Sequence, residues 1–226
     1  MQKGKLIHCN GIVQCEESLQ PGYRQENGID IGSFRNIFFK DFELDYILDF
    51  SLEKGIHFHI ATHSEATSTC EDKARITGLP LERVIKGYYL QDLKNGKVYA
   101  LTIPGNRKYD KNKITEFLGI PQKESASRLV RSRWLPMHIE EGTVHPFVNS
   151  TDFNGKHDGG KLEAILFDGI FSEKRKKEGG LDDFSITTHP STGYDNHRIS
   201  IQINYNDALE ILKENFSNRV QVTNLV

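Results

Sequence analysis

Residues 81–103, LERVIKGYYLQDLKNGKVYALTI, decide the fold of this chain. Two runs rich in apolar and β-branched residues flank the loop 92–96, which ends in Asn-Gly. An Asn-Gly pair between two such runs is a strong local signal for a β-hairpin. The first run carries Lys86 in its middle, and a lysine in an apolar strand must reach water, pair with an anion or lower its pKa. The simplest interpretation is an edge lysine whose stem lies on the core while its ammonium reaches solvent.

The whole chain has the composition of a soluble globular protein. Its formal net charge of −2 argues against a protein that coats nucleic acid, although a local basic face is compatible with it. We find no apolar run long enough to cross a membrane and no signal segment at the start. The widely spaced Cys9, Cys15 and Cys70 predict reduced thiols in a cytoplasmic protein.

The chain divides into two unequal parts, residues 1–40 and 41–226. Glycines interrupt the first part often, which predicts a small β extension packed on the main domain. From residue 41 the pattern predicts a helix that ends near Gly55, and then an alternating strand over 56–61. His57 and His59 share one face of this strand. We interpret them as a half-exposed face because no third metal ligand accompanies them.

Further elements follow along the chain. Residues 69–72, TCED, form a capping-box pattern before a short helix that Gly78 would close. After the hairpin, Asp110 is expected to cap a helix that ends at Gly119. The remaining predicted elements are a helix over 125–133, strands over 161–167, 184–188 and 198–203, a charged solvated loop over 171–183, and a last helix capped by Asn206 or Asp207.

Two basic segments lie on either side of the helix that begins after Asp110. A run of charge is usually a solvated face. Two such runs around one helix nevertheless favour a surface that binds phosphate, formed by Arg107, Lys108, Lys111, Lys113, Arg131 and Arg133.

Residues 142–147, GTVHPF, form a loop motif in which Gly142 and Pro146 lie on either side of the residues 143–145. Glycine lets the backbone approach a ligand closely, and proline stiffens the turn. By itself the motif is also compatible with an ordinary tight turn.

The order of these motifs resembles the YbaK-like aminoacyl-tRNA deacylase family, which includes the editing domain inserted in bacterial prolyl-tRNA synthetases. The resemblance covers about residues 41–220. It rests on His63 and the helix start at Thr69, on the run 78–86 that leads to Lys86, on the loop 142–147, and on the closing strand and helix, 199–216. It implies an α+β fold with a mixed, curved, open-barrel-like central sheet and surrounding helices.

The resemblance also implies an activity. The protein would act in trans in the cytoplasm as a hydrolase of the ester bond of a mischarged tRNA, with no metal or organic cofactor. Its partners would be the acceptor end of that tRNA and an aminoacyl-tRNA synthetase. We find no Gly-x-Ser-x-Gly elbow, zinc motif or phosphate-binding glycine loop. An aminoacyl ester is already activated, so water can attack it once the substrate is positioned and the oxyanion is stabilised.

By position, the resemblance assigns catalysis to Lys86, Gly142 and His145. Lys86 would hold a phosphate or the reacting ester by its charge. Backbone N–H groups of the 142–146 loop would meet the carbonyl oxygen, and His145 would act as a general base or shape the pocket. The expected substrate-binding residues are His63, Thr69, Gly87, Thr143, Val144, Pro146 and Phe147, and the basic residues above would contact the tRNA.

Three positions depart from the family pattern. Gly87 stands where relatives more often carry Asn or Thr, His145 where they carry Ser or Thr, and Val148 where they carry Gly. Residues 1–40, 149–160 and 171–183 have no clear counterpart. These departures keep open a non-catalytic module that binds tRNA or an aminoacyl group beside a synthetase. A third hypothesis is an unrelated metal-dependent hydrolase that uses His57, His59 and a carboxylate.

Overall fold

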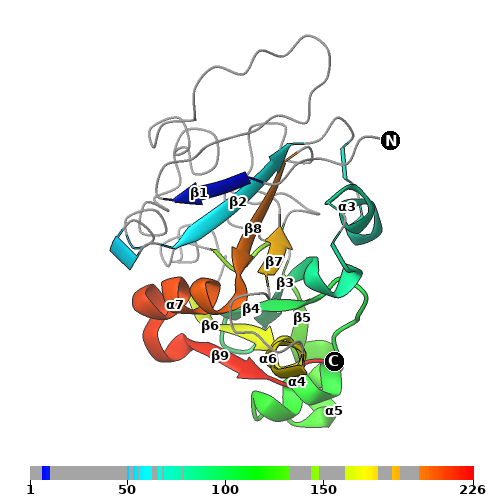
Figure 1. Cartoon of the computed structure of the whole chain (residues 1–226). Helices are drawn as coiled ribbons and strands as arrows, with labels where there is room; N and C mark the ends of the chain where they lie inside the picture. The colour runs from blue at the N-terminus through cyan, green and yellow to red at the C-terminus, as the bar shows by residue number, and fades with distance from the viewer. Residues whose placement is uncertain are drawn as a thin grey trace.

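A computed structural model describes residues 7–10, 50, 53–54, 56–62, 66–67, 69–77, 79–132, 144–147, 161–177, 185–188 and 199–226 (Figure 1). The strands are β1 (Ile7–Asn10), β2 (His57–Thr62), β3 (Ile85–Asp92), β4 (Lys97–Pro104), β5 (Leu129–Arg131), β6 (Lys161–Asp168), β7 (Ser185–Thr188), β8 (Ile199–Asn204) and β9 (Val220–Thr223). The helices are α3 (Cys70–Thr77), α4 (Lys111–Phe117), α5 (Gln122–Arg128), α6 (Ile170–Lys177) and α7 (Tyr205–Phe216), with short 3-10 turns η1 (Leu81–Arg83) and η4 (Ser217–Arg219).

The strands form two sheets. One is antiparallel with the order β1-β2-β8-β7, and the other has the order β5-β3-β4-β6-β9. In the second sheet β3 is antiparallel to β4 and β5, whereas β6 is parallel to β4 and β9. Helices surround this mixed sheet, and α4 and α5 lie together beside it (Figure 1). The predicted α+β class is therefore confirmed.

The predicted hairpin is the centre of the mixed sheet. β3 and β4 pair from Ile85↔Pro104 to Asp92↔Lys97. Residues 93–96 form the turn, in which Gly96 adopts a φ of 70° that favours glycine. The N–H of Gly96 donates to the carbonyl of Asp92 at 2.8 Å, and the Asn95 side chain accepts from the N–H of Lys97 at 3.0 Å. Asn-Gly thus ends a longer turn, and it still fixes the register of the two strands.

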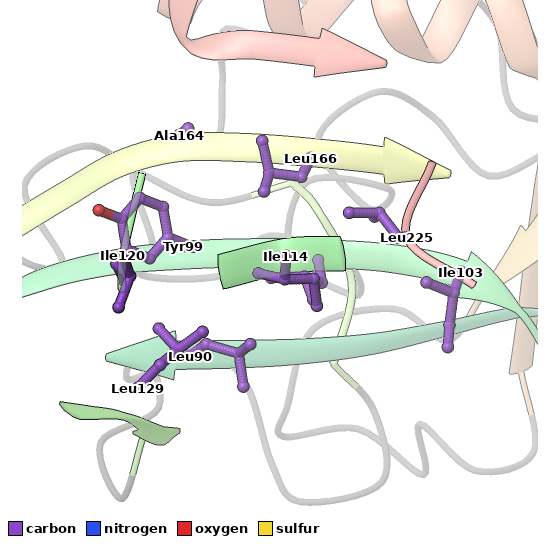
Figure 2. Packing of buried hydrophobic residues seen from close by; sticks show 10 residues of the cluster. Leu90, Tyr99, Ile103, Ile114, Ile120, Leu129, Ala164, Leu166 and Leu225 are labelled. Atoms are coloured by element: carbon purple, nitrogen blue, oxygen red, sulfur yellow. The ribbon is translucent and has the colours of Figure 1, made fainter. Parts of the chain in front are cut away.

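One face of the mixed sheet carries an apolar core that α4 covers. Figure 2 shows side chains from β3, β4 and β6 on this face, together with Ile114 of α4 and Leu225. Ile114 and Leu225 are each 0% exposed. Burial of a side chain of this size stabilises a fold by roughly 1.5–3 kcal/mol. The cluster comprises Leu90, Tyr99, Leu101, Ile103, Ile114, Ile120, Leu129, Ala164, Leu166 and Leu225.

The opposite face packs on α6 and α7. Phe167 of β6 meets the ring of Tyr205 with centroids 5.9 Å apart, and Phe171 of α6 meets the same ring at 5.6 Å. The side chain of Asn204 accepts from the N–H of Asn206 at 2.9 Å and caps α7. The predicted cap at Asn206 or Asp207 is therefore wrong by a few residues, because β8 runs directly into the helix and its last residue serves as the cap.

Two further predictions are wrong. The helix expected over 125–133 ends at Arg128, because Leu129–Arg131 pairs with β3 as strand β5. The solvated loop expected over 171–183 contains most of helix α6, whose Phe171 is fully buried against Tyr205. Most of the helix expected between residue 41 and Gly55 lies outside the described residues.

Candidate active site

Gly87 on β3 lies against the loop 144–147. All four residues of this loop are buried, and Phe147 is 5% exposed. A Cβ atom placed on Gly87 would lie 2.4 Å from the carbonyl oxygen of Val144 and 2.6 Å from its Cγ1. Real Cβ atoms do not approach other atoms so closely, so only glycine allows this contact. The structure thus brings together two predicted substrate-binding residues, Gly87 and Val144.

Tyr89 makes a second contact with the same loop. Its hydroxyl donates to the carbonyl of His145 at 3.0 Å in a buried hydrogen bond. Alternate residues of a strand share a face, so Gly87 and Tyr89 point to the same side of β3. Gly87 leaves room for Val144, and Tyr89 donates the hydrogen bond to the His145 carbonyl. Together they fix the backbone of the loop that carries His145.

The side chain of Lys86 leaves β3 on the other face, next to the turn after β4. Its ammonium donates to the carbonyl of Arg107 at 3.3 Å, at the surface of the protein. β5 pairs with β3 only from Leu90 to Asp92. Among the described residues, β4 is therefore the only strand that pairs with β3 at Lys86 and Gly87. The two motif positions lie on opposite faces of β3.

Helix α3 lies close to Lys86. The Thr69 hydroxyl accepts from the N–H of Asp72 at 3.0 Å and donates to its carboxylate, so the predicted substrate-binding Thr69 serves as the cap of α3. A Cβ on Gly105 would lie 2.9 Å from the Cβ of Cys70, which shows how tightly α3 packs on the end of β4.

Burial is the main influence on the pKa values of Cys70 and Lys73 in α3. It raises the pKa of the Cys70 thiol, and the positive charges of Lys86 and Lys73 only partly oppose this effect. Lys73 is 2% exposed, and burial lowers its pKa well below the usual value. The thiol therefore stays protonated at neutral pH and is a poor nucleophile.

The predicted basic residues make different contacts. Arg107 and Lys108 are exposed, and Lys111 begins α4. The ammonium of Lys113 instead donates to the side chain of Asn224 at 3.2 Å and to the carbonyl of Val226, so it holds the last residues of the chain. The Arg131 guanidinium lies 5.8 Å from the centre of the Tyr88 ring.

Some predicted site residues lie outside the part of the chain that the structure describes. They are His63, Gly142, Thr143 and Arg133. Within the described residues, no group of three His, Cys, Asp or Glu side chains is arranged to hold a metal ion. The helices described here also include none that is long and apolar enough to cross a membrane.

Sequence reasoning missed Tyr89 and Tyr109. Tyr89 follows Gly87 by two residues, so strand alternation alone places it on the face that carries the loop contact. Tyr109 meets Tyr88 edge to face with ring centroids 4.9 Å apart, and its position within the basic segment 104–113 is the signal that identifies it.

Comparison with known proteins supports the fold. No protein-family model and no curated protein sequence matches the chain. The crystal structure of the hypothetical protein APE2540 is similar with a TM-score of 0.51 and 16% identity, over 80% of this chain and 98% of that chain. A candidate trans-editing enzyme for prolyl tRNA synthetase aligns with a TM-score of 0.47 and 17% identity, over 81% of this chain and 96% of that chain. The similarity to APE2540 at this identity shows a shared fold alone.

Proposed function

We propose that this protein hydrolyses the ester bond of a mischarged aminoacyl-tRNA and acts in trans in translation quality control. One observation carries the proposal. Gly87, next to Lys86, is in contact with Val144, although the two motifs are far apart in the sequence. Gly87 directly follows the run 78–86 and Val144 belongs to the loop 142–147, which are two of the four features on which the resemblance to aminoacyl-tRNA deacylases rests. The spatial neighbourhood of β3 and the 144–147 loop supports a single site built from both.

The proposed reaction is attack of water on the ester carbonyl. The new bond joins the water oxygen to the carbonyl carbon, and collapse of the tetrahedral intermediate breaks the bond to the ribose oxygen. That oxygen leaves with a proton, so the products are a free amino acid and a free tRNA. Backbone N–H groups of the loop would stabilise the oxyanion, which is commonly the largest contribution to such catalysis. Lys86 would hold the terminal phosphate at the strand edge.

His145 would shape the aminoacyl pocket. It is 3% exposed, and its ring lies 6.0 Å from that of Phe147. A general base must reach the water that it activates. A side chain so deeply buried is better suited to limiting the size of the bound amino acid.

A second candidate function is binding without hydrolysis. Its motivation is that the Lys86 ammonium is directed to the Arg107 carbonyl, on the face of β3 away from Val144. Such a module would recognise tRNA or an aminoacyl group beside a synthetase. The two functions make opposite predictions for Lys86.

The test is a deacylation screen of tRNAs charged with each small amino acid, followed by variants of Lys86. Lys86→Met keeps the aliphatic stem and removes the charge, so we expect the rate on the best substrate to fall roughly a hundredfold. Lys86→Arg should be similarly impaired, because a forked guanidinium does not reproduce a compact ammonium.

The matched control is Lys94→Met, which removes an exposed lysine from the turn of the same hairpin. It should deacylate at the parent rate. A Lys86→Met protein that hydrolyses the ester at close to the parent rate excludes the role of Lys86. A complete screen without hydrolysis, but with tRNA binding, favours the binding module.

A further inference from the structure

A pair of tyrosines lies on the strand face that carries Lys86. Tyr88 follows Lys86 by two residues and so shares its face, about 7 Å further along the strand. The Tyr109 ring packs edge to face against the Tyr88 ring with centroids 4.9 Å apart. Both tyrosines are only partly buried, and they rest on the apolar core beneath. Each ring therefore has a rigid support and an accessible part.

Positive charge surrounds this pair. The Arg131 guanidinium lies 5.8 Å from the Tyr88 ring centre on the side of β5. Arg107 and Lys108 precede Tyr109 and are exposed. Among the described residues, no carboxylate forms an ion pair with Arg107 or Lys108. The carboxylate of the neighbouring Asp110 caps α4, where it accepts from the N–H groups of Asn112 and Lys113.

An aromatic pair flanked by exposed positive charges matches one class of ligand. Each unpaired nucleotide carries a flat base, which stacks on aromatic rings, and a phosphate, which binds a positively charged side chain. An acidic peptide would meet the cations but would leave the rings unused. The arrangement therefore favours single-stranded nucleic acid over an acidic protein partner.

We propose that Tyr88 and Tyr109, with Arg107, Lys108 and Arg131, form a stacking platform for an unpaired nucleotide at the 3′ end of the tRNA. The proposal rests on the proposed function in one respect, because it places the terminal nucleotides beside Lys86. The base lies against the tyrosine rings, and the adjacent phosphates meet the arginine and lysine side chains. Lys86 lies two residues before Tyr88 on the same face of β3, next to the bound nucleotide.

The test measures binding of a fluorescently labelled single-stranded RNA that ends in CCA, by fluorescence anisotropy at several salt concentrations. Tyr109→Leu removes the ring and should weaken binding roughly tenfold, whereas Tyr109→Phe keeps the ring and should bind within about twofold of the parent. Arg107→Gln with Lys108→Gln should reduce the slope of log K against log salt by roughly 1.4, since each released phosphate contact contributes about 0.7 on single strands.

The control for charge is Lys213→Gln, an exposed lysine on α7. It should leave affinity and salt slope unchanged. Thermal melting of each variant identifies any loss of folding, and the doubly neutralised protein changes only exposed side chains. Equal binding by Tyr109→Leu and the parent, an unchanged salt slope, or equally tight binding of a polyglutamate peptide would overturn the platform.

The outcomes also separate the platform from the proposed reaction. If the variants weaken RNA binding as expected while no charged tRNA is hydrolysed, the platform stands and the hydrolase proposal fails. If the parent hydrolyses mischarged tRNA and Tyr109→Leu changes neither the Kd for RNA nor the KM, the hydrolase stands and the platform fails.

Discussion

At Gly87, the carbonyl oxygen of Val144 lies 2.4 Å from the place where a Cβ atom would be. This glycine departs from the Asn or Thr that is more common in the family that the sequence motifs resemble. The contact gives it a physical reason, since any side chain would push the 144–147 loop away from β3. The glycine is therefore what allows the 144–147 loop to pack directly on β3 in this chain.

Gly87→Ala should displace the loop and destabilise the protein. Overpacking against backbone atoms costs roughly 1–3 kcal/mol, because a carbonyl oxygen cannot rotate aside as a side chain can. We expect a lower melting temperature and loss of ester hydrolysis. The control is Gly169→Ala, whose Cβ would meet the Thr223 carbonyl oxygen at an ordinary 3.6 Å. Equal melting temperatures for the two variants would show that the 144–147 loop can move away from β3 without loss of stability.

Tyr89→Phe tests the second contact of the loop. The change removes the hydrogen bond to the His145 carbonyl and keeps the ring, so we expect about 1–2 kcal/mol of lost stability. Because the loop backbone is then less fixed, kcat for deacylation should fall more than KM rises.

Tyr99→Phe provides the comparison for Tyr89→Phe. Burial raises the pKa of Tyr99 to about 12, and its hydroxyl has no hydrogen bond to another described residue. Its removal should leave stability and kcat near the parent values, as measured by urea unfolding and single-turnover deacylation. A loss in Tyr99→Phe as large as that in Tyr89→Phe would assign the effect to the core in general.

At the scale of elements, one ion pair joins the hairpin to α5. The Nε and Nη2 atoms of Arg128 each donate to Asp92 at 2.7 Å. The Asp92 side chain is 1% exposed, and that of Arg128 is 18% exposed. The Arg128 hydrogen bonds lower the pKa of Asp92, and burial opposes them. The pair holds Arg128 where the chain changes from helix to strand.

This pair predicts a pH dependence of stability. The pKa of Asp92 is lower in the folded than in the unfolded chain, so its contribution is complete above the unfolded value of about 3.9 and is lost as pH falls through the folded value. Asp92→Asn should melt roughly 5 °C below the parent at pH 7, and the gap should close in acid once pH has fallen through the folded pKa of Asp92. Glu124→Gln, at the more exposed end of the network, should show a much smaller gap. A gap for Asp92→Asn that is the same at pH 7 and in acid would contradict this account.

Local signals in the sequence predicted some elements and not others. The hairpin, the cap of α3 at Thr69 and the cap of α4 at Asp110 depend on neighbouring residues, so pattern reasoning finds them. β5 was missed because Leu129–Arg131 is a strand only through its pairing with β3. The short strand β9 was missed for the same reason, since it forms by parallel pairing with β6.

In the candidate site, too, some features follow from the local sequence and others depend on contacts between distant segments. Its motif positions could be found from residue types and their order along the chain. The contact of Gly87 with Val144 joins segments far apart in sequence, and no local pattern contains it. The position of Lys86 relative to the loop likewise depends on the direction of each side chain from β3, which follows from the register with β4.

At the scale of the whole molecule, the segment 220–226 connects parts of the fold that are distant in sequence. β9 extends the mixed sheet beyond β6, and Leu225 then enters the core beneath α4 (Figure 2). The N–H of Leu225 donates to the buried Asp168 at 2.7 Å, and its carbonyl accepts from the N–H of Asp110 at 2.6 Å. Asp110 caps the helix that follows the Arg107–Tyr109 segment. The last residues therefore support the surface that we assign to RNA.

Leu225→Ala should destabilise the whole mixed sheet. Leu225 is 0% exposed, and the loss of a buried leucine costs roughly 2–5 kcal/mol through lost burial and the cavity that remains. The midpoint of urea unfolding should shift without a change in slope, because the cluster joins α4, β4 and β6 and is expected to unfold as one unit.

The control is Val222→Ala on the same segment, where a 39% exposed side chain should change stability by less than about 0.5 kcal/mol. If both variants unfold at the parent midpoint, Leu225 is not part of the cooperative core. If Leu225→Ala instead gives two separate transitions, the segment supports only its local surroundings, and RNA binding at Tyr109 should weaken before the rest of the sheet unfolds.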